Sequence, residues 1–227
     1  MPCIAKKFER QREEMKNDEL DNVDAVITTR ELARMIKQGG IEFTELEDSE
    51  FDSPMGEATG AGAIFGTTGG VMEAALRTAY ESLTGEELKK LDFEQVRGKE
   101  GIKRATIKIG DIDVKVAVAH GLGNAQTIME EIKNGKADYQ FVEIMACPGG
   151  CIMGGGQPIK TAKVRATKDV RKLRADALYT IDEKSKIRKS HENPVIKQLY
   201  QEYLIEPGGH KAHELLHTHY VKREKYQ

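Results

Sequence analysis

Residues 139–158, YQFVEIMACPGGCIMGGGQP, constrain the fold more than any other part of the sequence. An apolar run typical of a buried strand leads directly into Cys147-Pro-Gly-Gly-Cys151, and five glycines lie between residues 149 and 156. Thiolates bind iron, and glycines let a backbone approach a bulky cluster and direct N–H groups at its sulfides. The CxxxC spacing differs from that of a CxxC redox pair or a usual zinc pair. The segment therefore predicts metal ligation, with a glycine-rich turn around two buried thiols or a redox disulfide as alternatives.

Cys3 is a second and weaker candidate for a thiolate ligand. It lies just before Lys6 and Lys7, at the start of a charged segment. Neighbouring cations and a following helix both stabilise a thiolate anion. Taken alone, Cys3 could equally be a terminal cysteine without a function.

Composition and periodicity divide the chain into two parts. Residues 1–160 mix strand and helix patterns, including a hairpin predicted over 102–121 around the turn residues Gly110-Asp111. Residues 161–227 carry helix patterns only, with Asn193-Pro194 as a helix start. We therefore expect an α/β domain over 1–160, built on a small mixed sheet flanked by helices, and an all-helical tail over 161–227.

The remaining elements are predicted from local signals. Thr28 or Thr29 would cap one helix, and Gly39-Gly40 would end it. An acidic stretch over 42–57 is expected to be a solvated loop, and GAGAIFG over 60–66 a tight loop rather than a dinucleotide fingerprint. We expect helices over residues 5–20, 30–38, 71–85, 124–135, 194–204 and 210–227, and strands over 24–29 and 139–146.

Charge and composition exclude several classes of partner. The 35 basic and 37 acidic residues nearly cancel, and there is no Trp, so bulk attraction to nucleic acid or base stacking is not expected. No apolar run approaches the roughly 18 residues that a membrane span needs. The charged N-terminus lacks the apolar core of a signal peptide, and three cysteines make no disulfide framework. These features predict a cytoplasmic protein in a reducing compartment.

Three segments together resemble one family. MPCIAKKFER, GAGAIFGTTGGVMEAALRTA and EIMACPGGCIMGGGQP are similar to successive signatures of the [FeFe]-hydrogenase catalytic domain. SHENPVIKQLYQEYL and GGHKAHELLHTHY resemble the helical small-subunit segment of the same enzymes. The resemblance covers nearly the whole chain, and it implies reversible reduction of two protons to H₂.

The resemblance implies a role for eight residues. Cys3, Cys147 and Cys151 would bind a [4Fe–4S] cubane, and the Cys151 sulfur would also bridge to a two-iron subcluster carrying CO, CN⁻ and a dithiolate amine. Lys6 would donate a hydrogen bond to a cyanide, as a buried ammonium needs an anion beside it. The side chains that would pack around the two-iron unit and exclude water are Met1, Phe65, Val71 and Met145.

The sequence also departs from the family. A fourth cubane cysteine and the last proton donor come from a TSCCPxW-type motif upstream, and neither occurs here. We therefore expect no catalytic residue on this chain alone and no activity without the N-terminal half of the domain or a second subunit. Other expected partners are maturation proteins and a ferredoxin or other iron–sulfur electron carrier. An exposed half-domain would also present an apolar face, which favours self-association.

Two other functions are open to this sequence. One is a hydrogenase-like iron–sulfur assembly protein without H₂ chemistry. Against it, the chain has the complete set of pocket residues that the hydrogenase resemblance implies, namely Lys6, Phe65, Met145 and the GGGQP turn. The other is a zinc peptidase, because His213-Glu-Leu-Leu-His217 matches HExxH. Glu224 is the only downstream candidate for its third ligand, so a packed histidine cluster at the solvent edge is the favoured interpretation.

Overall fold

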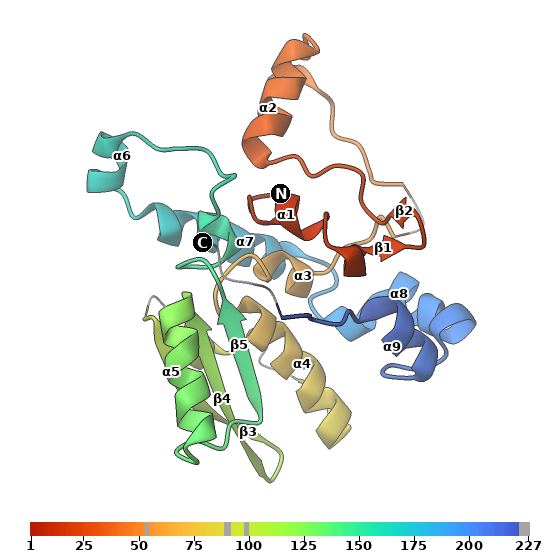
Figure 1. Ribbon diagram of the computed structural model, residues 1–227, viewed down its shortest axis with the longest axis vertical. Helices are drawn as coiled ribbons and strands as arrows, with labels where there is room; N and C mark the ends of the chain where they lie inside the picture. Colours follow the sequence, from red (N-terminus) through yellow and green to blue (C-terminus); the bar gives the residue numbers. More distant parts are fainter. Residues whose placement is uncertain (53–54, 89–91, 98–99, 223–227) are drawn as a thin grey trace.

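A computed structural model describes residues 1–52, 55–88, 92–97 and 100–222 (Figure 1). At its centre is a three-stranded sheet in the order β3-β4-β5. β3 (Ile102–Ile109) and β4 (Ile112–His120) form the predicted antiparallel hairpin, and Gly110 adopts the left-handed φ of +57° that the turn needs. β5 (Phe141–Met145) runs parallel to β4 after the crossover helix α5 (Leu122–Lys133). The sheet is therefore mixed, as predicted.

Alternation along β4 buries both faces of the sheet. Val116 and Val118 pack with α4 (Gly70–Thr84) through Met72 and Leu76, whereas Ala117 and Ala119 pack against Ile128 of α5. Because successive side chains of a strand point to opposite faces, one apolar run supports a helix on each side. Figure 1 shows α4 and α5 flanking the sheet.

β5 corrects one expectation. Residues 139–146 were predicted as a buried strand, yet Phe141 and Ile144 are exposed and only Glu143 is fully buried. The reason is topological, because β5 has one neighbouring strand and forms an edge of the sheet. An apolar run predicts burial but does not identify what covers it.

The N-terminal region differs most from prediction. The helix predicted over 5–20 is reduced to α1 (Lys6–Glu9), a 3₁₀ turn (Glu13–Met15) and a two-residue hairpin of β1 (Lys16–Asn17) and β2 (Leu20–Asp21). α1 buries no residue, and a charged helix without tertiary packing is marginal. The strand predicted over 24–29 is irregular and ends in the N-cap of α2 (Thr29–Gln38).

Predictions from local capping residues were more accurate than the predicted element lengths of the N-terminal region. The Thr28 hydroxyl accepts the N–H of Glu31, whose carboxylate accepts the Thr28 N–H, which completes a capping box. α2 ends at Gly39, as predicted. Residues 60–66 are not simply a loop, because α3 (Gly60–Ile64) forms there with Thr59 as its cap.

The described part of the tail, residues 161–222, contains helices and no strand. The elements of the tail are α6 (Ala162–Thr167), α7 (Val170–Lys184), a 3₁₀ turn (Ser190–Glu192), α8 (Pro194–Leu199), a π-helical turn (Tyr200–Leu204) and α9 (His210–Leu216). The first part of the chain also contains the 3₁₀ turns Phe43–Glu45, Glu94–Val96 and Cys151–Met153. The helix predicted over 210–227 therefore ends eleven residues early, and residues 223–227 lie outside the described part. In the described ranges, no helix has the length and apolarity that a bilayer crossing requires.

A buried ionic network fastens the tail to the first part of the chain. The guanidinium of Arg77 on α4 donates to both carboxylate oxygens of Asp182 on α7, each at 2.8 Å, and to Glu73 at 2.8 Å. All three side chains are 0% exposed. Burial would raise the pKa of Asp182, but Arg77 and Arg188 outweigh it and lower that pKa. The charges are therefore paired, as burial requires.

Candidate functional site

The CPGGC segment is a tight turn that follows β5. The N–H of Gly150 donates to the carbonyl oxygen of Cys147 at 2.9 Å, and Gly149 and Gly150 both have φ of +90°. Side chains rarely occupy that region, so these two positions require glycine. The turn holds Cys147 and Cys151 on one short segment with a fixed backbone.

This turn packs backbone to backbone on the loop between α3 and α4. The N–H of Ile152 donates to Gly66 at 3.0 Å, and the N–H of Thr68 donates to Gly149 at 3.3 Å. A Cβ on Gly150 would lie 2.7 Å from the Thr68 nitrogen. The glycines therefore permit an approach that no other residue would allow.

The N-terminus packs on the second group of glycines. The N–H of Gly156 donates to the carbonyl oxygen of Pro2 at 2.8 Å, and a Cβ on Gly154 would lie 2.3 Å from the same oxygen. On the other side, the carbonyl oxygen of Met1 accepts the N–H of Thr29 at 3.0 Å. Residues 1–3 thus lie between the glycine segment and the start of α2, which brings Cys3 to the cysteine turn.

The three thiols share one electrostatic environment. Burial raises the pKa of Cys151, and the negative charges of Cys3 and Cys147 raise it further, while the Lys6 ammonium opposes them. All three cysteines are half-buried free thiols, so the structure contains no disulfide among them. Positions 3, 147 and 151 therefore converge, together with one cation.

The spacing of the thiols does not suit a single ion. Ligands of one zinc ion at bonds of about 2.3 Å lie within roughly 4.6 Å of one another. Among the described residues, the group of three ligand atoms that meets a 4.8 Å limit is Glu81, His191 and Glu192, and the cysteines form no such group. Wider spacing is expected when each sulfur binds a different metal atom of a cluster.

The other predicted site residues lie on the segments that meet at the turn. Phe65 ends α3, Val71 is in the first turn of α4 and Met145 ends β5. Val71 and Met145 are half-buried, whereas Phe65 is 45% and Met1 is 52% exposed. Lys6, also half-buried, forms an ion pair with Glu9 at 2.5 Å.

Glu143 is a residue that sequence reasoning missed. Its carboxylate is buried under the first turn of α4 and accepts the N–H groups of Gly69 at 2.6 Å and Met72 at 2.7 Å. Burial raises its pKa, although these bonds favour the ionised form. The contact fastens the end of β5 to the start of α4. The sequence signal that could have revealed Glu143 was a charged residue within an otherwise apolar strand pattern.

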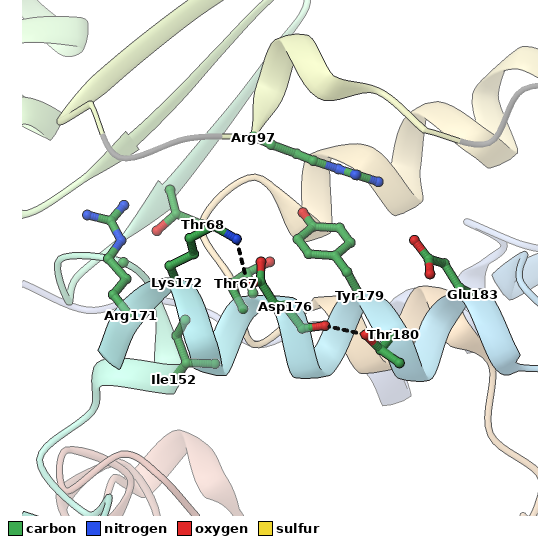
Figure 2. A pocket seen from close by; sticks show the side chains of 12 residues that line it. Thr67, Thr68, Arg97, Ile152, Arg171, Lys172, Asp176, Tyr179, Thr180 and Glu183 are labelled. Carbon is green, nitrogen blue, oxygen red and sulfur yellow. Dashed lines mark hydrogen bonds and ion pairs between the residues drawn. The ribbon is translucent and has the colours of Figure 1, made fainter. Parts of the chain in front are cut away.

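A cavity of about 460 Å³ lies between the cysteine turn and α7 (Figure 2). Gly149, Ile152 and Thr68 line one wall, and the α7 side chains of Arg171, Lys172 and Tyr179 are among those that line the other. None of the three cysteines lines it. This cavity therefore lies beside the cysteine turn and does not contain the thiols.

Comparison with known proteins identifies the class of protein to which this fold and its thiol-bearing turn belong. The family model described as "Iron only hydrogenase large subunit, C-terminal domain" matches residues 1–155, and "Iron hydrogenase small subunit" matches residues 168–223. The chain belongs to the iron-only hydrogenase family. The HExxH motif thus lies within the small-subunit match, which gives the zinc-peptidase alternative no support.

Relatives and solved structures agree with this assignment. The chain is 51% identical over 99% of its length to the NADP-reducing hydrogenase subunit HndD of Solidesulfovibrio fructosivorans, and 50% identical over 98% to iron hydrogenase 1 of Clostridium pasteurianum. It covers only 38% and 39% of those two proteins. A variant of the apo [FeFe]-hydrogenase HydA1 of Chlamydomonas reinhardtii superposes with a TM-score of 0.77 at 47% identity, over 97% of this chain and 61% of that chain.

More distant relatives include proteins named for a different role, iron–sulfur cluster assembly. The chain is 35% identical over 97% of its length to protein NAR1 of Arabidopsis thaliana, and 33% identical over 99% to a cytosolic Fe-S cluster assembly factor of Xenopus tropicalis. It covers 48% and 47% of these proteins.

Proposed function

We propose that this chain forms the C-terminal part of the H-cluster domain of an [FeFe]-hydrogenase, an enzyme that interconverts protons and H₂. Cys3, Cys147 and Cys151 would supply three of the four cubane ligands, and the Cys151 sulfur would also bridge to the two-iron subcluster. The observation that carries the proposal is the packing of residues 1–3 on Gly154–Gly156, which brings a thiol 144 residues distant in sequence to the cysteine turn.

The residues present fit such a group. Thiolates are soft ligands that suit iron–sulfur clusters, and tight glycine turns give a large cluster room beside the backbone. Lys6 acts electrostatically on Cys151, which suits a site where bound thiolates and cyanide would accumulate negative charge. When bound, the H-cluster would supply the two-electron redox chemistry of proton reduction.

The protein's own contribution would be placement and exclusion of water. Lys6 would exchange its Glu9 ion pair for a hydrogen bond to the cluster. Val71 and Met145 are half-buried beside the turn and would form apolar walls. Phe65 and Met1 are more exposed, so they would complete those walls when the rest of the domain covers this face.

The missing ligand requires a partner. With three thiols on this chain, the fourth cubane cysteine and a proton donor would come from an upstream half or a second subunit. Coverage of 38% of HndD is consistent with such a region in the relatives. We propose that the chain alone does not evolve H₂, that maturation proteins assemble its cluster, and that a ferredoxin or similar carrier delivers electrons. A cytoplasmic location stays a prediction.

Infrared spectroscopy of a reconstituted assembly tests the proposal. The chain would be co-purified with the N-terminal half of a relative under maturation conditions, with CO and CN⁻ bands as the readout. Cys151→Ala should abolish these bands and H₂ evolution, because it removes the bridging thiolate. Met153→Ala removes the thioether of the same turn and should leave them intact. Unchanged bands in Cys151→Ala would refute the assignment.

Similarity to NAR1 favours one second candidate, an iron–sulfur assembly protein without H₂ chemistry. That protein would hold iron and acid-labile sulfide but show no CO or CN⁻ bands. Changing Cys3, Cys147 or Cys151 to serine would lower the iron content whichever of the two functions the protein has. The bands alone therefore distinguish the two candidates.

A further inference from the structure

The histidine-rich end of the tail has no role in the proposed function. Four of the six histidines of the chain lie in one ten-residue stretch, which spans α9 and the residues after it: His210, His213, His217 and His219. All four are exposed. Imidazole is the side chain that Zn²⁺, Ni²⁺ and Cu²⁺ share as a ligand, so the stretch is rich in suitable donors.

Two of these imidazoles are already paired. The rings of His213 and His217 are stacked, with centroids 4.6 Å apart and planes within 5° of parallel. Helical residues four apart lie on the same face, which is why HExxH brings its two histidines together. Small rotations of exposed side chains are fast, so two nitrogens can turn toward one ion at bonds of about 2.0–2.1 Å.

Further donors surround the same place. His210, His213, Glu214 and His219 line one hollow of about 570 Å³. In the described part of the chain, the side chains of His217 and His219 make no hydrogen bond that metal binding would have to break. His213 therefore shares this hollow with two other imidazoles and a carboxylate. No three ligand atoms of the described residues here lie within 4.8 Å of one another, so exposed side chains must turn toward the ion to bind it.

The other candidate metal group differs in one respect. Glu81, His191 and Glu192 lie within 4.8 Å, but the ammonium of Lys189 contacts Glu81 at 2.6 Å and Glu192 at 3.0 Å. That ammonium occupies the position that a cation would take. The histidine stretch has no such internal cation, since Lys211 lies over the ring of Tyr203.

We propose that His213 and His217 form a surface chelate for a late first-row divalent cation such as Ni²⁺ or Zn²⁺, with His210 or His219 as a third ligand. The site binds and does not catalyse. α9 has seven residues, and the four histidines of the stretch are exposed to solvent. Binding cross-links the last turn of α9, which ends at Leu216, and extends the helix through His217.

Calorimetric titration of the untagged, reduced apo chain with NiCl₂ tests the chelate. His213→Gln or His217→Gln should each weaken the tail site by roughly tenfold or more, because loss of even a supporting group at a metal site typically costs 10–100-fold. The three cysteines are the same in every variant, so a change in affinity reports the tail. Equal affinity in wild type and both variants would overturn the proposal.

A matched variant separates spacing from histidine number. His217→Gln combined with Thr218→His keeps four histidines in the stretch but replaces the four-residue spacing with five. We expect it to bind as weakly as His217→Gln and to gain no helical circular dichroism with Ni²⁺, whereas the wild type gains it. Wild-type affinity in this double variant would mean that histidine number alone is responsible and would refute the chelate.

Discussion

At the scale of single residues, glycine positions explain how the site forms. Gly154 has φ of −58°, a value that any residue adopts, so only the close approach of Pro2 requires glycine there. Gly150 has both a left-handed backbone and a close contact with Thr68. The same residue type is thus needed for two different reasons within five positions.

Gly154→Ala should separate Cys3 from the cysteine turn. The added Cβ would lie 2.3 Å from the Pro2 carbonyl oxygen, so residues 1–3 must move. We expect reduced iron incorporation on reconstitution and little change in helix content. Gly39→Ala is the matched control, because its Cβ would have its nearest contact at 3.4 Å. Equal iron content in both variants would contradict this account of the site.

At the scale of elements, paired charges determine how the tail docks. α7 is only weakly apolar along its length, and its buried residue is Asp182. The corresponding partner on α4 is Arg77, 105 residues away in sequence. Because a buried charge needs paired charges around it, the bidentate contact of Arg77 with Asp182 favours the packing of these two helices against each other.

Arg77→Met should destabilise the protein strongly. It leaves Asp182 and Glu73 buried without their shared cation, and breaking a buried pair costs about 3–5 kcal/mol. Lys172→Met removes an exposed pair with Asp176 and should cost about 0–1 kcal/mol. Urea unfolding monitored by circular dichroism measures both, and similar losses in the two variants would disprove the role of the network.

Acid should weaken the contact between α4 and the 3₁₀ turn at Ser190–Glu192. The hydrogen bond from Lys189, together with the Leu88 N–H and His191, lowers the pKa of Glu81 to about 2. A carboxyl group with a depressed folded pKa stabilises the protein above its ordinary value of 4.5, and this contribution disappears as pH falls from 4.5 toward 2.

Urea midpoints between pH 7 and pH 3 measure this loss. Glu81→Gln removes the titrating group, so its midpoint should fall less over that range than that of the wild type. Glu87→Gln, an exposed position near the end of the same helix, serves as the control. Parallel pH profiles for Glu81→Gln and wild type would contradict the expectation.

At the scale of the whole molecule, several large apolar residues are exposed near the cysteine turn. Ile4, Phe65 and Ile144 are 42–49% exposed near the cysteine turn and the edge strand. Large apolar surfaces of this kind mark interfaces. The chain covers 38% of HndD, and under the proposed function the additional region of such a relative would be the partner for this face.

The isolated chain should therefore self-associate. Light scattering over a range of concentrations should show an apparent mass that rises with concentration. Ile144→Thr should lower that tendency, because it makes the edge strand more polar, whereas Leu122→Thr changes an apolar residue that is 72% exposed on α5 and should not. If the wild type keeps the mass of a monomer at every concentration, these exposed apolar residues do not drive self-association.

Much of the local structure and the main thiol segment could be predicted. Thr28 and Gly39 delimited α2, and Gly110-Asp111 located the hairpin. The CPGGC segment forms the expected tight turn, and its thiolate chemistry stays a prediction. The lengths of the first and last helices could not be predicted, because both are charged and depend on packing. Glu143 was missed because an apolar strand pattern conceals the one buried carboxylate within it.

The sequence by itself predicted which residues would carry chemistry and determined where tight turns occur, because thiols and left-handed glycines are local properties. Only the tertiary structure decided that Pro2 packs on Gly154, that Arg77 pairs with Asp182, and that β5 is an edge strand. Those contacts join residues 25 to 152 positions apart along the chain. Their partners are selected by burial and by the pairing of charge in three dimensions, which no local pattern encodes.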